Sequence, residues 1–183
     1  LSRMSRFWFG LTKDIVPNHF IALADDKDAL GSLADHPSIA SLDPLIARQA
    51  MVVKRAERID VECVVRAYLT GSALVDYEES STIFGIPVPE GLVDGSKLPE
   101  LLFTPTTKAE VGHDEPMSID QVGKAIGPSL AHQIQEMSFT VFNRAHDHAA
   151  ERGIIIADTK FEFGIRDGEV ILIDEVLTPD SSR

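Results

Sequence analysis

Cysteine is nearly absent from this 183-residue sequence, which contains only Cys63. A single cysteine excludes a disulfide framework within the chain and favours a reducing compartment, so we expect a cytoplasmic location. Long apolar runs are also missing, since no stretch reaches the roughly 18 residues of a membrane span. The opening residues, LSRMSRFWFGLTK, lack the unbroken apolar segment of a signal peptide. We therefore expect no membrane partner.

Basic residues are scarce, because 17 Lys and Arg stand against 29 Asp and Glu, giving a net charge of -12. Proteins that bind nucleic acid need a basic patch along the phosphates, so this composition predicts no nucleic-acid partner. A few well-placed cations can still hold a small anionic ligand. The apolar content of 44% is typical of a globular protein with a hydrophobic core.

The residue pattern predicts an α+β chain with long irregular connections. Residues 1–11 have helical character, and within the mixed segment 22–50 the stretch DDKDALGSLADHPSIASLDP (25–44) is predicted to be an exposed excursion between elements. Ser118 with Gln121 three residues later is a capping-box pattern, which predicts that a helix begins there. A longer amphipathic helix follows the break at Gly127–Pro128.

A half-buried strand is predicted from Ile59 to Arg66, where apolar and polar residues alternate. Glu62 and Arg66 lie on its polar side, and an ordinary ion pair between them is one interpretation. Cys63 lies on the apolar side, so we expect it in the core. Ser72, just after the strand in TGSA, is interpreted as a cap of the next helix or as a turn residue.

Three charged residues, Asp158, Lys160 and Glu162, share one face of a predicted strand in ADTKFEFGIRDGEVILIDE. If Asp174 of the following strand lies beside Glu162, the two carboxylates need a cation between them. Mg²⁺ suits such a site, because it takes one or two carboxylates and completes its octahedron with water and phosphate oxygens. Lys160 would face the same phosphates. A solvated ladder of surface ion pairs is the alternative interpretation.

The turn between these two strands decides whether Glu162 and Asp174 meet. A two-residue loop, Asp167–Gly168, would place Asp174 on the same face as Phe161. A three-residue loop, residues 166–168, would place Asp174 on the face of Glu162. We predict the three-residue loop, because it leaves no carboxylate alone among aromatic side chains.

Two stretches, VECVVRAYLTGSA (61–73) and IIIADTKFEFG (154–164), resemble the signature segments of SAICAR synthases, the ATP-dependent ligases of purine biosynthesis. VPNHF, VVKR, HDEPMS and IDEVLTPDSSR resemble further segments of that family in the same order. The resemblance covers nearly the whole chain. It implies a two-lobed ATP-binding α+β fold, with an antiparallel sheet flanked by helices and the nucleotide in a cleft between the lobes.

The resemblance also implies a reaction. ATP phosphorylates the carboxylate of a carboxylated aminoimidazole ribotide (CAIR), and L-aspartate then displaces the phosphate. Glu162 and Asp174 match the positions that hold Mg²⁺ on the ATP phosphates. Lys160 would stabilise charge on the transferred phosphoryl group. Asp158 would orient substrate or receive a proton from the amine, so Lys160 and Asp158 are the expected catalytic residues.

Binding residues follow from the same resemblance. The expected ATP-binding residues are Val53, Lys54, Arg55, Glu62 and Lys108. The expected substrate-binding residues are Arg66, Ser72, His113, Asp114 and Arg183, of which Arg66 and Ser72 match positions that grip CAIR. The first three of the ATP set match the hinge along which adenine lies. The arginines suit a phosphate or carboxylate, because a guanidinium binds such groups with two parallel hydrogen bonds.

We expect the chain to be a fragment, because nothing in it resembles the family's glycine- and lysine-containing β-lobe and neither end resembles a natural terminus. Residues 1–57 would be the remainder of the N-terminal lobe and the hinge. Residues 58–183 would be a truncated C-terminal ATP- and substrate-binding lobe. Such a fragment is expected to be inactive or nearly so by itself. Its exposed apolar edge would favour partner chains, including a homo-oligomer, or aggregation.

Two other functions remain open. A small-molecule kinase also arranges carboxylates around Mg·ATP, and it would release ADP without aspartate. A non-catalytic fragment would carry the charged strand face as a solvated surface, without Mg²⁺-dependent nucleotide binding.

Overall fold

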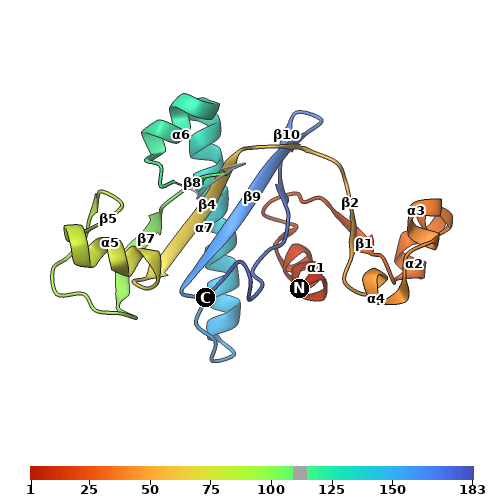
Figure 1. The fold of residues 1–183 in the computed structure, drawn as a ribbon, viewed down its shortest axis with the longest axis horizontal. Coiled ribbons are helices and arrows are strands. Elements are labelled where there is room, and N and C mark those ends of the chain that lie inside the picture. The colour runs from red at the N-terminus through yellow and green to blue at the C-terminus, as the bar shows by residue number, and fades with distance from the viewer. Residues whose placement is uncertain (109–114) are drawn as a thin grey trace.

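An antiparallel sheet forms the centre of the chain (Figure 1). The structure, a computed structural model, describes residues 1–108 and 115–183. Within these residues the sheet has 6 strands in the order β10-β9-β4-β7, with β3 paired to β9 and β8 paired to β4. The strands are β3 (Glu57–Arg58), β4 (Val61–Tyr68), β7 (Lys97–Phe103), β8 (Thr106–Thr107), β9 (Asp158–Arg166) and β10 (Glu169–Ile173). The predicted α+β fold is confirmed.

Three helices pack around this sheet: α1 (Ser2–Thr12), α6 (Ile119–Ile126) and α7 (Pro128–Ala150). Helix α7 crosses one face and contacts β4 and β9 (Figure 1). The predicted capping box begins α6, because Ser118 Oγ accepts the Gln121 N–H at 3.2 Å and the Gln121 side chain accepts the Ser118 N–H at 2.7 Å. The chain then turns at Gly127, whose φ of +92° favours glycine, and Pro128 starts α7.

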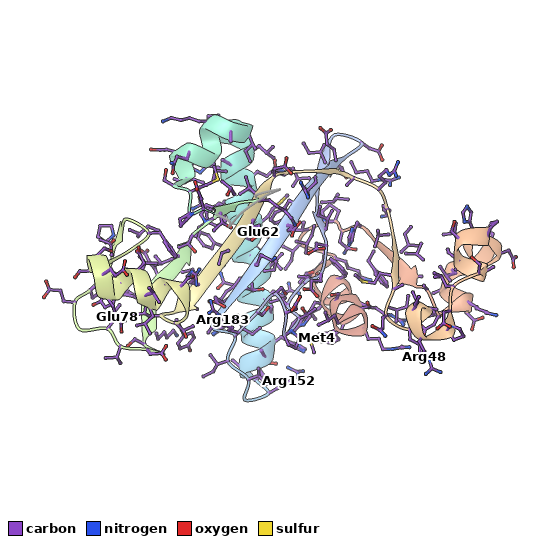
Figure 2. All side chains as sticks on the ribbon, viewed as in Figure 1. Met4, Arg48, Glu62, Glu78, Arg152 and Arg183 are labelled. Atoms are coloured by element: carbon purple, nitrogen blue, oxygen red, sulfur yellow. The ribbon has the colours of Figure 1, made fainter. Side chains whose placement is uncertain are left out.

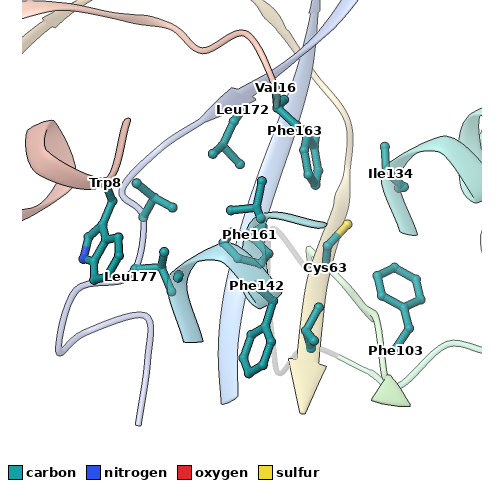
Figure 3. Close-up of a cluster of buried hydrophobic side chains, with 14 of the residues drawn as sticks. Trp8, Val16, Cys63, Phe103, Ile134, Phe142, Phe161, Phe163, Leu172 and Leu177 are labelled. Carbon is teal, nitrogen blue, oxygen red and sulfur yellow. The ribbon is translucent and has the colours of Figure 1, made fainter. Parts of the chain in front are cut away.

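The main hydrophobic core lies between α7 and the sheet (Figure 3). Phe161 and Phe163 of β9 point into it, as does Cys63 of β4, which is fully buried as predicted. Burial raises the pKa of the Cys63 thiol, so this group stays protonated. Trp8 of α1 belongs to the same core, which therefore joins the first helix to the central strands.

Two smaller units flank the sheet at opposite ends in Figure 1. The first includes the predicted excursion and is made of β1 (Phe20–Leu23), α2 (Lys27–Leu30), a 3-10 turn (Gly31–Asp35), α3 (Pro37–Ala40), α4 (Pro44–Ala47) and β2 (Met51–Val53). The second contains α5 (Ser72–Ser80), β5 (Thr82–Ile83) and β6 (Ile86–Pro87), and has its own apolar cluster around Leu69 and Ile83. Strand β7 was not predicted as a member of the central sheet.

The loop between β9 and β10 differs from the prediction. Ile173 pairs with Glu162 and Glu169 pairs with Arg166, which leaves Asp167–Gly168 as a two-residue loop. Both loop residues have positive φ, +53° and +84°, as in the hairpin turns that match the natural twist of paired strands. The predicted three-residue loop is therefore wrong, because this Asp-Gly pair can form the tighter turn.

Candidate active site

One face of the β4–β9 pair carries charged side chains, and the opposite face is covered by α7. Arg66 pairs directly with Asp158, and Val64 pairs with Lys160. Because alternate residues of a strand point to the same face, the even-numbered residues of β4 and β9 share this face. The charged residues on it are Glu62, Arg66, Asp158, Lys160 and Glu162. Of these, only Lys160 is not buried; the other four are at most 7% exposed. A solvated ladder of ion pairs is thus the wrong interpretation of this face.

Two ion pairs occupy the end of this face near Glu62. Lys160 Nζ lies 3.1 Å from Glu62 Oε1, and Lys108 forms an ion pair with Glu162. The predicted pair between Glu62 and Arg66 is not formed. Burial alone would lower the pKa of Lys160, but its hydrogen bond to Glu62 and the charges of Glu62, Glu162 and Asp174 outweigh burial and raise it. Lys160 therefore stays an ammonium group at neutral pH.

Asp174 reaches the same region as Glu162 although the predicted register is wrong. Strand β10 ends at Ile173, and Asp174 follows with a left-handed φ of +62°, so it no longer obeys the alternation of the strand. Asp174, Glu162 and Lys160 line a cavity of about 560 Å³. The turn that follows the strand, and not the hairpin loop, brings the two carboxylates together.

A neighbouring cavity of about 500 Å³ joins these carboxylates to the predicted hinge. Its walls include the predicted hinge residues and the predicted phosphate-binding residues, namely Val53, Lys54, Arg55, Lys108, Glu162 and Asp174. The structure therefore brings together the residues expected to bind the adenine and those expected to bind the phosphates. Glu62 lies beside Lys160, to which it is hydrogen-bonded.

Three residues in this region were not predicted from the sequence: His19, Glu175 and Asp180. All three line the larger cavity. His19 Nε2 donates a hydrogen bond to the Asp174 carbonyl oxygen at 3.1 Å, and burial lowers the pKa of His19, so the ring is neutral. Burial, followed by the nearby carboxylates of Asp180 and Asp174, raises the pKa of Glu175. The only sequence signal for His19 was its place in VPNHF.

The donor atoms at Glu162 and Asp174 fit Mg²⁺, because they are carboxylate oxygens that face one cavity. Among the residues that the structure describes, no group of three or more His, Cys, Asp or Glu is gathered to hold a metal. Two carboxylates suffice for Mg²⁺ only when phosphate and water oxygens complete its coordination. The ion pair with Lys108 places a cation beside Glu162.

At the other end of the charged face, Asp158 holds two arginines. Arg66 Nη1 donates to Asp158 Oδ2 at 3.1 Å, and Arg183 donates to both oxygens, at 3.1 and 2.6 Å. Figure 2 shows Arg183 at the opposite end of the strand pair from Glu62. Burial lowers the pKa of Arg66, and the Asp158 charge partly offsets this effect. The Asp158 carboxylate, predicted to be catalytic, is thus engaged by guanidinium groups.

Ser72 and Thr104 orient Arg66 further. Ser72 Oγ accepts from Arg66 Nη2 at 3.2 Å, and Thr104 Oγ1 accepts from Arg66 Nε at 2.9 Å. The predicted capping role of Ser72 is wrong, because Gly71 is the N-cap residue of α5 and no side chain caps this end. The arginine is therefore fixed in place with its guanidinium beside that of Arg183.

Gly71 leaves room for the close approach of Arg183. A Cβ atom at this position would lie 1.7 Å from Arg183 Nη1, whereas one at Gly31 would meet nothing within 4 Å. The two glycines have similar backbone angles, φ +59° and ψ −134° against φ +54° and ψ −127°. Gly31→Ala thus reproduces the backbone strain without the contact.

We expect Gly31→Ala to cost about 1–3 kcal/mol of unfolding free energy through strain alone. Gly71→Ala should cost roughly 1–2 kcal/mol more, because it also displaces Arg183 from Asp158. Urea denaturation of both variants measures the difference. Equal losses would show that the contact with Arg183 does not constrain this position.

Two further predicted residues, His113 and Asp114, lie outside the described residues.

The profile of one protein family, described as SAICAR synthetase, matches residues 1–183. The chain belongs to the SAICAR synthetase family. Among curated relatives, the phosphoribosylaminoimidazole-succinocarboxamide synthases of Saccharopolyspora erythraea and Polaromonas naphthalenivorans are 46% and 48% identical over the whole chain. The solved SAICAR synthase of Saccharomyces cerevisiae, complexed with SAICAR, aligns with 99% of the chain at a TM-score of 0.82 and 38% identity.

The chain spans 58% of the length of each of these two curated relatives and 60% of the yeast structure. A solved SAICAR synthetase in complex with ADP has the same fold at 22% identity and a TM-score of 0.71. Among the described residues, no helix is both long and apolar enough to cross a membrane.

Proposed function

We propose that this chain supplies the Mg·ATP-binding and CAIR-binding part of a SAICAR synthase. The observation that carries the proposal is the buried charged face of β4 and β9. One end of it, with Lys160 and Glu162, opens on the cavities beside the hinge. The other end holds Arg66 and Arg183 on one carboxylate. A nucleotide site and an anion site on one strand pair suit a reaction that transfers a phosphoryl group between two anionic ligands.

The hinge end binds the nucleotide in this proposal. Adenine lies along residues 53–55, Glu62 contacts the ribose, and Lys108 leaves Glu162 to bind phosphate. Glu162 and Asp174 hold Mg²⁺, which when bound neutralises charge on the ATP phosphates. ADP in a neighbour of the same fold agrees with nucleotide use. Lys160 stabilises the transferred phosphoryl group, because its ammonium form persists beside the carboxylates.

The arginine end binds CAIR. Arg66, Ser72 and Arg183 grip its phosphate or carboxylate, and His113 and Asp114 belong to a loop that contacts substrate. The CAIR carboxylate oxygen attacks the γ-phosphorus of ATP, and ADP leaves. The amine of aspartate then attacks the acyl carbon, the bond to the phosphate oxygen breaks so that phosphate leaves, and the nitrogen loses one proton to solvent. Asp158 acts here as a positioning residue for both arginines, because its two oxygens already accept their hydrogen bonds.

The parts of the chain have separate duties in this proposal. Residues 1–57 contribute the hinge and the remainder of an N-terminal lobe, and residues 58–183 contribute the substrate-binding lobe. The parent protein works in the cytoplasm, without a nucleic-acid or membrane partner. The chain covers only part of its relatives' length, so we expect it to be nearly inactive alone. Exposed apolar residues, such as Phe7 and Ile155, make a homo-oligomer a testable arrangement.

The test is a chimera in which residues 1–183 replace the matching segment of the Saccharopolyspora erythraea relative. We expect ADP release that needs Mg²⁺, ATP, CAIR and aspartate together, and little or none from the chain alone. The unaltered relative is the positive control, and a thermal melt shows that the chimera folds. Release without aspartate would favour a kinase. A folded chimera without any Mg²⁺-dependent nucleotide binding would favour a non-catalytic role.

A further inference from the structure

His19 is a buried imidazole between the hinge and the carboxylate-bearing strand. It is 8% exposed and lines both cavities at the candidate site. The backbone of His19 links β10 to the hinge. Its N–H donates to Leu172 O at 3.1 Å, and its carbonyl oxygen accepts the Lys54 N–H at 2.7 Å. Any residue could make these two backbone hydrogen bonds, so they do not explain why position 19 carries a histidine.

The ring makes a third contact, to the backbone of Asp174. A carbonyl oxygen can only accept a hydrogen bond, so His19 Nε2 carries the proton in its 3.1 Å contact with Asp174 O. Asp174 has a left-handed φ of +62°, a conformation that is uncommon for residues with a side chain, although Asp adopts it more readily than most. The hydrogen bond from His19 thus holds Asp174, and the backbone turn at Asp174 brings the Asp174 carboxylate to the cavity.

Neighbouring contacts hold the ring in a fixed position. The Phe9 ring lies 5.4 Å from the imidazole centroid in an edge-on arrangement. Asn18 Nδ2 donates to Phe9 O at 3.2 Å, and Asn18 Oδ1 accepts the Phe20 N–H at 3.1 Å. The residues on both sides of His19 are therefore anchored, and the ring has little freedom to turn away from Asp174.

We propose that His19 is a positioning residue, which holds the backbone of Asp174 in its left-handed conformation so that the carboxylate faces the nucleotide cavity beside Glu162. The part of this inference that concerns Mg²⁺ rests on the proposed function. The structural part does not, because it concerns only the hydrogen bond and the conformation of Asp174. Loss of the ring donor would remove the hydrogen bond to the Asp174 carbonyl oxygen and release the turn.

Three variants test the proposal. His19→Leu removes the donor and keeps an apolar side chain, whereas His19→Gln keeps an N–H at a similar distance from the backbone. His132→Leu, at an exposed position of α7, is the matched control. The first readout is amide hydrogen exchange measured by NMR on the whole chain.

We expect His19→Leu to speed exchange of the Glu175 and Val176 amides about tenfold, and His19→Gln and His132→Leu to leave both near wild type. The Lys54 and Leu172 amides should not change in any variant, because their bonds go to backbone carbonyls. Equal acceleration at all four amides, or the same result for Leu and Gln, would overturn the proposal.

The second readout is the Mg²⁺ dependence of ADP binding by the chimera. We expect the gain in ADP affinity that Mg²⁺ produces to fall about tenfold in His19→Leu and to recover in His19→Gln, with little change in EDTA. If the parent chimera shows no Mg²⁺ effect, the proposed function fails, and the exchange readout still decides whether His19 holds Asp174. An unchanged Mg²⁺ effect in His19→Leu would overturn the metal part of the inference.

Discussion

Replacing Lys160 by Met in the chimera should lower kcat about a thousandfold, because the ammonium group stabilises charge that develops on the transferred phosphoryl group. The KM for ATP should change only a few-fold, since the hinge and the carboxylates remain. Lys160→Arg should retain part of the rate. Steady-state ADP release with saturating CAIR and aspartate measures both constants.

Lys124→Met, at an exposed position of α6, is the control for loss of one positive charge and should leave kcat unchanged. The pKa of Lys160 lies above its ordinary value of 10.5, so deprotonation of this group should not reduce the rate at neutral or mildly alkaline pH. A less than tenfold loss in Lys160→Met, with the fold intact, would remove this residue from the catalytic site.

Asp158→Asn is expected to give the largest loss of stability. It removes the countercharge from Arg66, which is 4% exposed, and an unpaired buried charge costs about 3–5 kcal/mol. Urea denaturation of the chain measures this loss. Asp60→Asn is the control, because Asp60 forms an exposed ion pair with Arg58 and should change stability by less than about 1 kcal/mol.

Kinetics separate the positioning role of Asp158 from a role as proton acceptor. Arg183→Met removes only the half-exposed partner, so the chimera should still fold when it carries this change. For both Asp158→Asn and Arg183→Met we expect the KM for CAIR to rise about tenfold, with the pH profile of kcat unchanged. If the pH profile of kcat lost one limb in Asp158→Asn but not in Arg183→Met, Asp158 would instead be the acceptor of the proton from the aspartate amine.

Local patterns predicted the elements that carry the charged face. The alternation along 59–66 and 158–163 follows from the two-residue period of a strand, and the structure keeps it. The capping box at Ser118 also predicts the start of α6, because its two hydrogen bonds join residues three apart. The strand alternation and the capping box each depend only on residues close together in the sequence, so the sequence alone was sufficient to predict them.

Partners that are distant in the sequence could not be predicted in the same way. Glu62 and Arg66 share a face, but each pairs with β9, 98 and 92 residues further along the chain. The position of Asp174 depends on one left-handed residue after β10, and no residue type marks that conformation reliably. Strand β7 has an irregular burial pattern and includes Pro99. Its sequence therefore lacks the apolar–polar alternation that predicts a strand.

The side chains of β9 point alternately to the core and to the charged face, and this arrangement restricts which substitutions the strand can accept during evolution. Of its nine residues, only Lys160, Ile165 and Arg166 are not buried. Residues of one parity fill the core, and those of the other parity carry charges that must find partners in the protein. A half-buried strand ordinarily leaves every second position free to vary, but here both sets are constrained, one by packing and one by charge. Divergence of substrate preference would therefore be easier in the surrounding loops than along β9 itself.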